Sequence, residues 1–157
     1  ASPAGGAGAT MLDKWDQRFM DVARLVASWS KDPSTRVGAV LVHPQQKRIV
    51  STGYNGYPRS LEDDDGLDRE RKLSRTIHAE MNAILHAREP TEGLTLYVTP
   101  LPPCDRCAAH IIQAGIRRVV YDGGDLGRWA SSASASMDYF REASVQVEEF
   151  PASDKAI

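Results

Sequence analysis

The fold of this chain is decided by the stretch Pro103-Cys104-Asp105-Arg106-Cys107, which holds its only two cysteines. Cysteines three positions apart in the first turn of a helix lie on one face, so both thiolates can reach a single metal ion. Upstream, His78-Ala79-Glu80 offers an imidazole. One nitrogen and two sulfurs make three ligands, and tetrahedral zinc with three protein ligands keeps a fourth position open for water. The pattern therefore predicts a catalytic zinc site.

The spacing of His78 and Glu80 indicates where this site lies on its helix. Residues two apart in a helix interior diverge by about 200°, so both can serve one centre only from the opening turn. We therefore expect both metal-binding segments to be helix N-termini, where the helix dipole also favours thiolate. Glu80 then lies beside the metal as the proton carrier and is not a ligand.

The ordered pair of motifs, H-x-E and then P-C-x-x-C, is typical of zinc-dependent deaminases of nucleobases. His78 and Cys104 are 26 positions apart, with Pro103 in place. In this chemistry zinc lowers the pKa of its bound water to about 7, and Glu80 moves a proton between that water and the base. Two other interpretations stay open: a closed structural zinc site completed by a residue such as His110, and a thiol redox pair.

Composition narrows the class of partner. The 157 residues are 41% hydrophobic and 25% charged, as in an ordinary soluble globular protein. The net charge of −2 favours a small-molecule nucleotide over a nucleic acid polymer. No apolar run approaches the roughly 18 residues of a membrane span, so we expect no membrane partner. Two free cysteines suit a reducing compartment, which predicts the cytoplasm.

The chain reads as one domain. Residues 1–10 are rich in glycine and alanine and are interpreted as a cloning remnant or a disordered leader. Residues 11–157 are expected to form a single zinc-dependent deaminase domain.

An alternation of helices and strands predicts an α/β fold. Apolar residues at helical spacing indicate a first helix from Asp13 to Ser30, with Trp29 on its buried stripe. Further helices are expected over 78–88, 104–114 and 131–143, and strands over 37–42, 49–54, 95–98, 118–121 and 145–150. The first two strands form a hairpin, the later ones pair in parallel, and 122–128 is a glycine-rich loop. The prediction is a three-layer α/β/α arrangement with a five-stranded mixed sheet.

Two segments carry competing interpretations. The charged stretch Leu61–Arg75 is either a solvated loop with a short helix, or a segment whose cations close over an anionic group of the substrate. Asn55, before Gly56, is either a turn residue that tolerates positive φ or a polar contact to a sugar. Further candidates for phosphate contact are Lys31, Arg36 and Arg106, and candidates for base stacking are Tyr121 and Trp129.

From about Lys14 to Phe150 the chain resembles the cytidine deaminase-like superfamily, and within it the deoxycytidylate (dCMP) deaminases. The zinc motifs are shared by the whole superfamily, whereas residues 30–39 (SKDPSTRVGA) and 53–56 (GYNG) resemble the dCMP branch. The resemblance implies hydrolytic deamination of dCMP to dUMP with release of ammonia. Other cytosine nucleosides, a free base or a modified deoxycytidylate remain alternative substrates, and a non-catalytic zinc-binding module is the alternative from another class.

The resemblance also implies roles for individual residues. His78, Cys104 and Cys107 are expected to bind Zn²⁺, with Glu80 as the proton shuttle. The expected substrate-binding residues are Asn55 at the sugar, the backbone near the base pocket, and neighbours of the zinc motifs and the first strand: Val37, Gly38, Ala39, Lys31, Arg36, Ala79 and Pro103. A homo-oligomer, dimer or hexamer, is expected, and dCTP and dTTP are expected effectors.

Overall fold

Five strands form one mixed sheet in the order β2-β1-β3-β4-β5. The strands are β1 (Gly38–His43), β2 (Arg48–Tyr54), β3 (Thr95–Thr99), β4 (Arg118–Asp122) and β5 (Gln146–Phe150). Strand β1 pairs antiparallel with β2 and with β3, while β3, β4 and β5 are parallel. The predicted hairpin and the predicted parallel half of the sheet are both confirmed.

The computed structural model describes residues 12–62, 66–124 and 126–151. The leader predicted at 1–10 and the acidic residues 63–65 lie outside the described residues. Among the residues described, no helix is long and apolar enough to span a bilayer.

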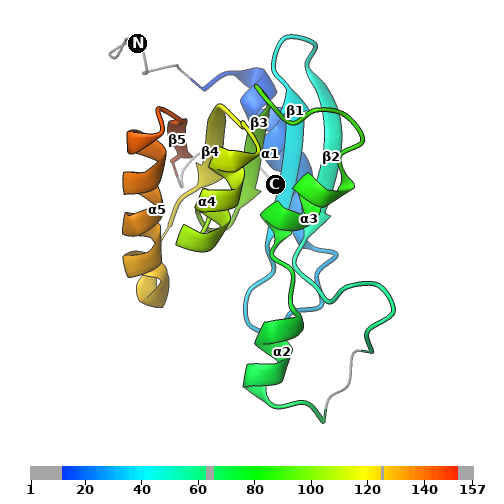
Figure 1. Cartoon of the computed structure of the whole chain (residues 1–157). Coiled ribbons are helices and arrows are strands. Elements are labelled where there is room, and N and C mark those ends of the chain that lie inside the picture. Colours follow the sequence, from blue (N-terminus) through cyan, green and yellow to red (C-terminus); the bar gives the residue numbers. More distant parts are fainter. Residues whose placement is uncertain (1–11, 63–65, 125, 152–157) are drawn as a thin grey trace.

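Helices cover both faces of the sheet, which confirms the three-layer arrangement (Figure 1). Helix α1 (Lys14–Ala27) packs on one face, where Phe19 and Met20 meet inward side chains of the strands such as Val40. Helices α3 (Ala79–His86), α4 (Asp105–Gln113) and α5 (Ala130–Glu142) cover the other face around a core with Leu96 and Phe140. The short helix α2 (Arg69–Arg75) buries none of its residues.

Helix α1 begins at a capping box and ends earlier than its apolar spacing predicts. Asp13 accepts hydrogen bonds from the amides of Trp15 and Asp16, and the Asp16 carboxylate accepts from the Asp13 amide. The helix stops at Ala27, so the expectation that Trp29 lies on its buried stripe is wrong. Trp29 is 52% exposed, because the chain leaves the helix before the stripe repeats.

Two loop predictions need correction. Neither Asn55 nor Gly56 has positive φ, because the segment continues from β2 as extended chain and Gly56 pairs with Ile77. The segment 122–128, predicted as a glycine-rich loop, is also not a loop at every described residue. Asp122 is the last residue of β4, and a 3-10 turn, η2 (Gly127–Trp129), leads into α5.

Helix α3 lies unusually close to strand β2, and Gly53 permits this. A Cβ atom on Gly53 would lie 2.4 Å from the Ala79 carbonyl oxygen and 2.4 Å from the Ala83 nitrogen. Side chains bridge the same contact: Ser51 donates to the Ala83 carbonyl at 2.6 Å, and Asn82 donates to the Tyr54 carbonyl at 2.8 Å. The helix that begins at His78 is therefore fixed against the sheet by backbone contact.

We expect Gly53→Ala to lower the free energy of unfolding by about 1–3 kcal/mol or more, because the methyl group meets helix backbone that must move. Denaturant titration measures the change. The matched control is Gly56→Ala, three residues away, where the nearest atom lies 3.9 Å from the added carbon. Equal stability of the two variants would contradict the close approach.

Candidate functional site

The predicted metal-binding segments are both helix starts, as expected. His78 is the N-cap residue of α3, and Cys104 is the N-cap residue of α4. The Cys104 sulfur accepts a hydrogen bond from the Cys107 amide at 3.4 Å, so the thiol acts as the helix cap. Because α4 follows β3, it begins at the carboxyl end of a parallel strand, where ligand sites of α/β proteins usually lie.

The three candidate ligand atoms converge tightly. His78 Nδ1 lies 3.3 Å from Cys107 Sγ and 3.5 Å from Cys104 Sγ, and all three atoms lie within 4.8 Å of one another. Tetrahedral zinc with ordinary Zn–N and Zn–S bonds separates such atoms by roughly 3.6 Å. The residues present therefore fit a zinc ion with three protein ligands.

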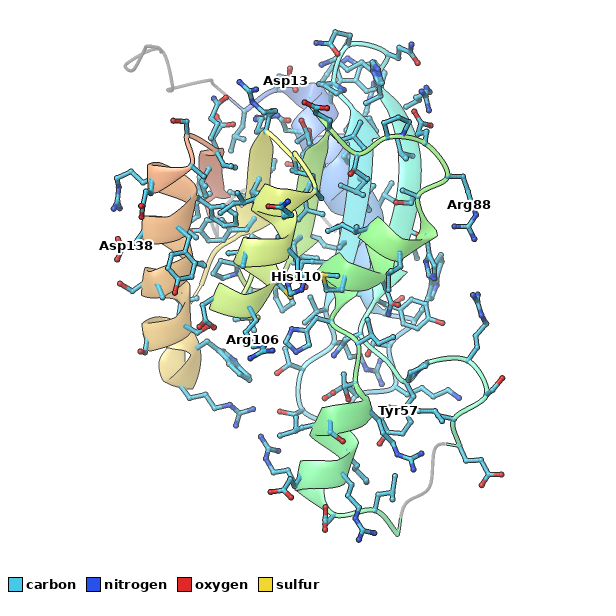
Figure 2. The ribbon with its side chains drawn as sticks, in the orientation of Figure 1. Asp13, Tyr57, Arg88, Arg106, His110 and Asp138 are labelled. Carbon is cyan, nitrogen blue, oxygen red and sulfur yellow. The ribbon has the colours of Figure 1, made fainter. Side chains whose placement is uncertain are left out.

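Among the residues described, this is the one group of three or more His, Cys, Asp or Glu side chains close enough to hold a metal ion. His110, the candidate fourth ligand of a closed site, does not join the group. Its ring bonds the Arg106 carbonyl at 2.8 Å on the exposed side of α4 (Figure 2). The geometry thus favours a site with one coordination position left for water over a closed structural site.

In the absence of a metal ion, the thiols of Cys104 and Cys107 have very different pKa values. The hydrogen bond from the Cys107 thiol lowers the pKa of Cys104 to about 4. The same bond, together with burial, raises the pKa of Cys107 well above its usual range. The bond to Cys104 also raises the pKa of His78. One thiolate is therefore already present at neutral pH, whereas the other two groups tend to keep their protons.

Glu80 lies in the first turn of α3 and is 4% exposed. Burial raises the pKa of its carboxyl to about 7, against the weaker effect of its own backbone amide, which donates to the carboxylate. A buried carboxyl with a pKa near neutrality can both accept and return a proton at physiological pH. No such property follows from the motif alone.

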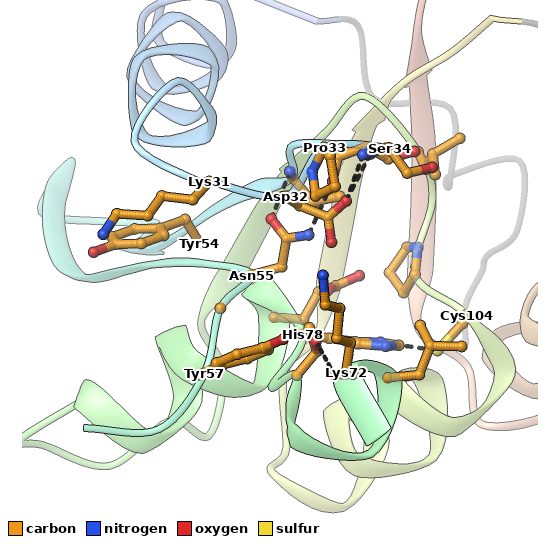
Figure 3. A pocket seen from close by; sticks show the side chains of 18 of the residues that line it. Lys31, Asp32, Pro33, Ser34, Tyr54, Asn55, Tyr57, Lys72, His78 and Cys104 are labelled. Carbon is orange, nitrogen blue, oxygen red and sulfur yellow. Dashed lines mark hydrogen bonds between the residues drawn. The ribbon is translucent and has the colours of Figure 1, made fainter. Parts of the chain in front are cut away.

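A pocket of about 850 Å³ opens over Glu80, His78 and Cys104. Its walls come from the segment after α1, the loop after β2, helix α2, the loop before α4, and η2 with the start of α5. Figure 3 shows the His78 ring directed at Cys104, with Asn55 on the opposite wall and Lys72 reaching in from α2.

Several of the predicted substrate-binding residues line this pocket, namely Lys31, Val37, Asn55 and Pro103. The others do not. Gly38 faces α1, since a Cβ there would lie 2.2 Å from the Ala23 carbonyl oxygen. Ala39 and Ala79 are fully buried in the core. Arg36 is exposed between Thr35 and Val37, which both face the pocket, because neighbours in extended chain point to opposite sides.

The buried Asn55 side chain already joins two neighbouring segments. Its Oδ1 accepts from the Val37 amide at 2.9 Å, and its Nδ2 donates to the Thr35 carbonyl at 2.9 Å. These bonds hold the two segments side by side in the pocket wall. One lone pair and one N–H of the amide remain available to a ligand.

Some of the residues predicted to contact phosphate or to stack on the base line the pocket, and others do not. Trp129 lines the pocket, as do Arg69 and Lys72 of the charged stretch. Arg106 and Tyr121 do not, and the Tyr121 hydroxyl donates instead to Glu149 of β5. Sequence reasoning missed several lining residues; these are Ser34, Tyr57, Arg59, Arg128 and Ser132. Apart from Ser34, which lies in the 30–39 segment, they belong to no motif, and only the fold brings them together.

The zinc motifs lie within a region that matches a known family. A model of the cytidine and deoxycytidylate deaminase zinc-binding region matches residues 13–122. The chain belongs to the cytidine and deoxycytidylate deaminase family. The His/Cys/Cys group is therefore the feature of a zinc-dependent hydrolytic deaminase, which agrees with its geometry.

Individual members of this family are similar over most of the chain. An uncharacterized deaminase in the luxG 3′ region of Aliivibrio fischeri is 47% identical over 145 residues, covering 90% of this chain and 97% of that protein. The human deoxycytidylate deaminase is 38% identical over 147 residues, covering 87% of this chain and 80% of that protein. The chain spans only 57% to 64% of the relatives from Drosophila melanogaster, Caenorhabditis elegans and Mus musculus.

The fold matches a solved member of the family. The dCMP deaminase of cyanophage S-TIM5, in complex with dCMP and dUMP, superposes with a TM-score of 0.72 at 26% identity. The match covers 90% of this chain and all of the phage protein. The five-stranded mixed sheet is thus the cytidine deaminase-like fold that the motifs predict.

We expect zinc binding at pH 7 to release about one to two protons, because Cys107 holds its proton and the His78 pKa is raised in the absence of metal. The apparent zinc affinity should accordingly rise with pH. Calorimetric titration of the metal-stripped protein with zinc, in buffers of different ionisation enthalpy, counts the protons. Binding without proton release would contradict this charge assignment.

Proposed function

We propose that this protein hydrolyses dCMP to dUMP and ammonia at a zinc ion held by His78, Cys104 and Cys107. The observation that carries the proposal is the buried Glu80 carboxyl beside the ligand group, at the base of a pocket large enough for a nucleotide. Kinship supports the choice of substrate, since the human deoxycytidylate deaminase and the phage dCMP deaminase match 87% and 90% of this chain.

When bound, zinc supplies a water molecule that ionises near neutral pH. Glu80 accepts the proton of the attacking water and delivers it to N3 of the cytosine, which makes C4 electrophilic. Once the water oxygen has bonded to C4, Glu80 takes the second proton from that oxygen and passes it to the C4 amine. The C4–N bond then breaks, ammonia departs and the C4 carbonyl of dUMP forms. A carboxyl with a pKa of about 7 suits both directions of transfer. The side chain is buried, so bulk water competes little for the proton.

The variant Glu80→Gln should keep zinc but lose at least about a hundredfold in kcat, because general acid–base catalysis contributes about 10²–10⁴-fold. Loss of cytosine absorbance with dCMP measures the rate, and metal analysis measures zinc. The control is Glu89→Gln, whose carboxylate pairs with Arg48 away from the pocket. A zinc-loaded Glu80→Gln enzyme with full activity would remove Glu80 from this role.

We further propose that cations on the pocket wall bind the 5′-phosphate. Among the described residues, the lining cations are Lys31, Arg59, Arg69, Lys72 and Arg128, and the lining acids are Asp32 and Glu80. The excess of positive charge is local, since the whole chain carries a net charge of −2. Lys72 reaches into the pocket from α2 (Figure 3) and is the candidate we favour from the charged stretch.

If a cation recognises the phosphate, kcat/KM for dCMP should exceed that for deoxycytidine by about 10–150-fold, the value of one charge-assisted hydrogen bond. Lys72→Met should lower kcat/KM for dCMP by a similar factor and leave deoxycytidine unchanged. The control is Lys47→Met at the tip of the β1–β2 hairpin, far outside the pocket. Equal turnover of nucleotide and nucleoside by the parent enzyme would contradict phosphate recognition.

The family resemblance supports four broader proposals. Residues 11–157 form one domain, consistent with the single sheet among the described residues. The protein acts in the cytoplasm as a homo-oligomer, dimer or hexamer. The apolar side chains of Leu25, Trp29 and Leu85, each more than half exposed, support self-association. The effectors dCTP and dTTP regulate it, which activity assays with each nucleotide test.

A further inference from the structure

Ser132 of α5 makes two hydrogen bonds with Asp105, the first residue of α4. The Asp105 amide donates to Ser132 Oγ at 3.0 Å, and the Ser132 hydroxyl donates to Asp105 Oδ1 at 2.9 Å. Neither residue belongs to the zinc motif's ligand positions. The two bonds join the start of α4 to the start of α5, which lies beside it in Figure 1.

These bonds act on the turn that carries both sulfurs. Asp105 follows Cys104 directly and opens α4, and the Cys107 amide donates to the Cys104 sulfur one turn along. The first amides of a helix have no partner within the helix. Here one amide is satisfied by the sulfur cap and another by Ser132. The orientation of the turn thus depends on a side chain from a different helix.

Ser132 also lines the pocket, so a contact with substrate is the competing role. Its single hydroxyl proton is already donated to Asp105, and one of its two acceptor sites receives the Asp105 amide. A substrate could use the hydroxyl only as an acceptor. The observed bonds therefore favour a structural link to α4 over direct recognition.

The turn η2, which precedes Ser132, is bonded to a second part of the pocket wall, the loop that contains Ser34. Arg128 donates to the Ser34 hydroxyl at 2.9 Å across the pocket, and its guanidinium lies 4.5 Å from the centre of the Trp129 ring. The wall made by η2 and the start of α5 is therefore tied both to the Ser34 loop and to α4. A wall held at two points can fix the position of the helix start that it touches.

We infer that Ser132 is a positioning residue that holds the first turn of α4, and with it Cys104, in the geometry that binds the metal. This inference rests on the proposed zinc site and adds a residue that lies outside both sequence motifs. The partners of metal ligands commonly change metal affinity by 10–100-fold when they are removed.

The test is zinc affinity, measured on the folded full chain by competition with a chromophoric chelator. Ser132→Ala removes the hydroxyl and should weaken zinc binding by about 10–100-fold. Ser132→Thr keeps the hydroxyl and should restore most of the affinity. The matched control is Ser131→Ala, an exposed serine in the same helix turn. Asp105→Ala tests the link from the other side, and should give a smaller loss because the amide remains.

Three results would overturn the inference. Zinc affinity of Ser132→Ala equal to the parent's would do so, as would a lowered Tm with unchanged zinc affinity, which indicates packing alone. A raised KM with unchanged zinc affinity would make Ser132 a substrate contact instead. The zinc titration needs no substrate, so its outcome is independent of whether dCMP is the molecule that is deaminated.

Discussion

Convergence of one imidazole and two sulfurs is the constraint on which the whole architecture depends. Three atoms from segments 26 residues apart lie within 4.8 Å of one another. Two helices must therefore begin side by side, and the parallel crossover from β3 through α4 to β4 supplies one of them at the correct edge of the sheet. The backbone contact at Gly53 fixes the other.

The same arrangement creates the electrostatic conditions for catalysis. Glu80 enters the interior only because α3 packs closely on the sheet, and its burial raises the carboxyl pKa to about 7. The Cys104 sulfur, in contrast, caps a helix and is stabilised as a thiolate by its neighbours. One edge of the sheet thus holds a carboxyl whose pKa is raised beside a thiol whose pKa is lowered.

The sequence was informative where chemistry restricts the choice of residue. Cysteine and histidine at those spacings are typical ligands of zinc, so the ligand group and both helix starts could be predicted. The alternation of helices and strands likewise indicated the three-layer arrangement and the mixed sheet. The errors fall where tertiary contacts decide: Trp29 continues an apolar period beyond the end of its helix, and Gly56 is extended because it pairs with Ile77.

The residues of the pocket wall were the hardest to predict from the sequence. Ser132 and Arg128 are common residue types outside any motif, and their importance comes from bonds to Asp105 and Ser34, which lie far away in the chain. Arg36 shows the converse, since a cation next to a pocket segment points away from it when the chain is extended. Such facts depend on the path of the backbone rather than on composition.

Helix α2 buries none of its residues, although it forms one side of the pocket. Its local unfolding should cost little free energy, since few apolar contacts are lost when it opens. Nucleotide entry and product exit can then proceed without disturbing the sheet. Substitutions in α2 are also nearly free of a stability penalty, so substrate range can diverge at this wall during evolution while the metal site stays unchanged.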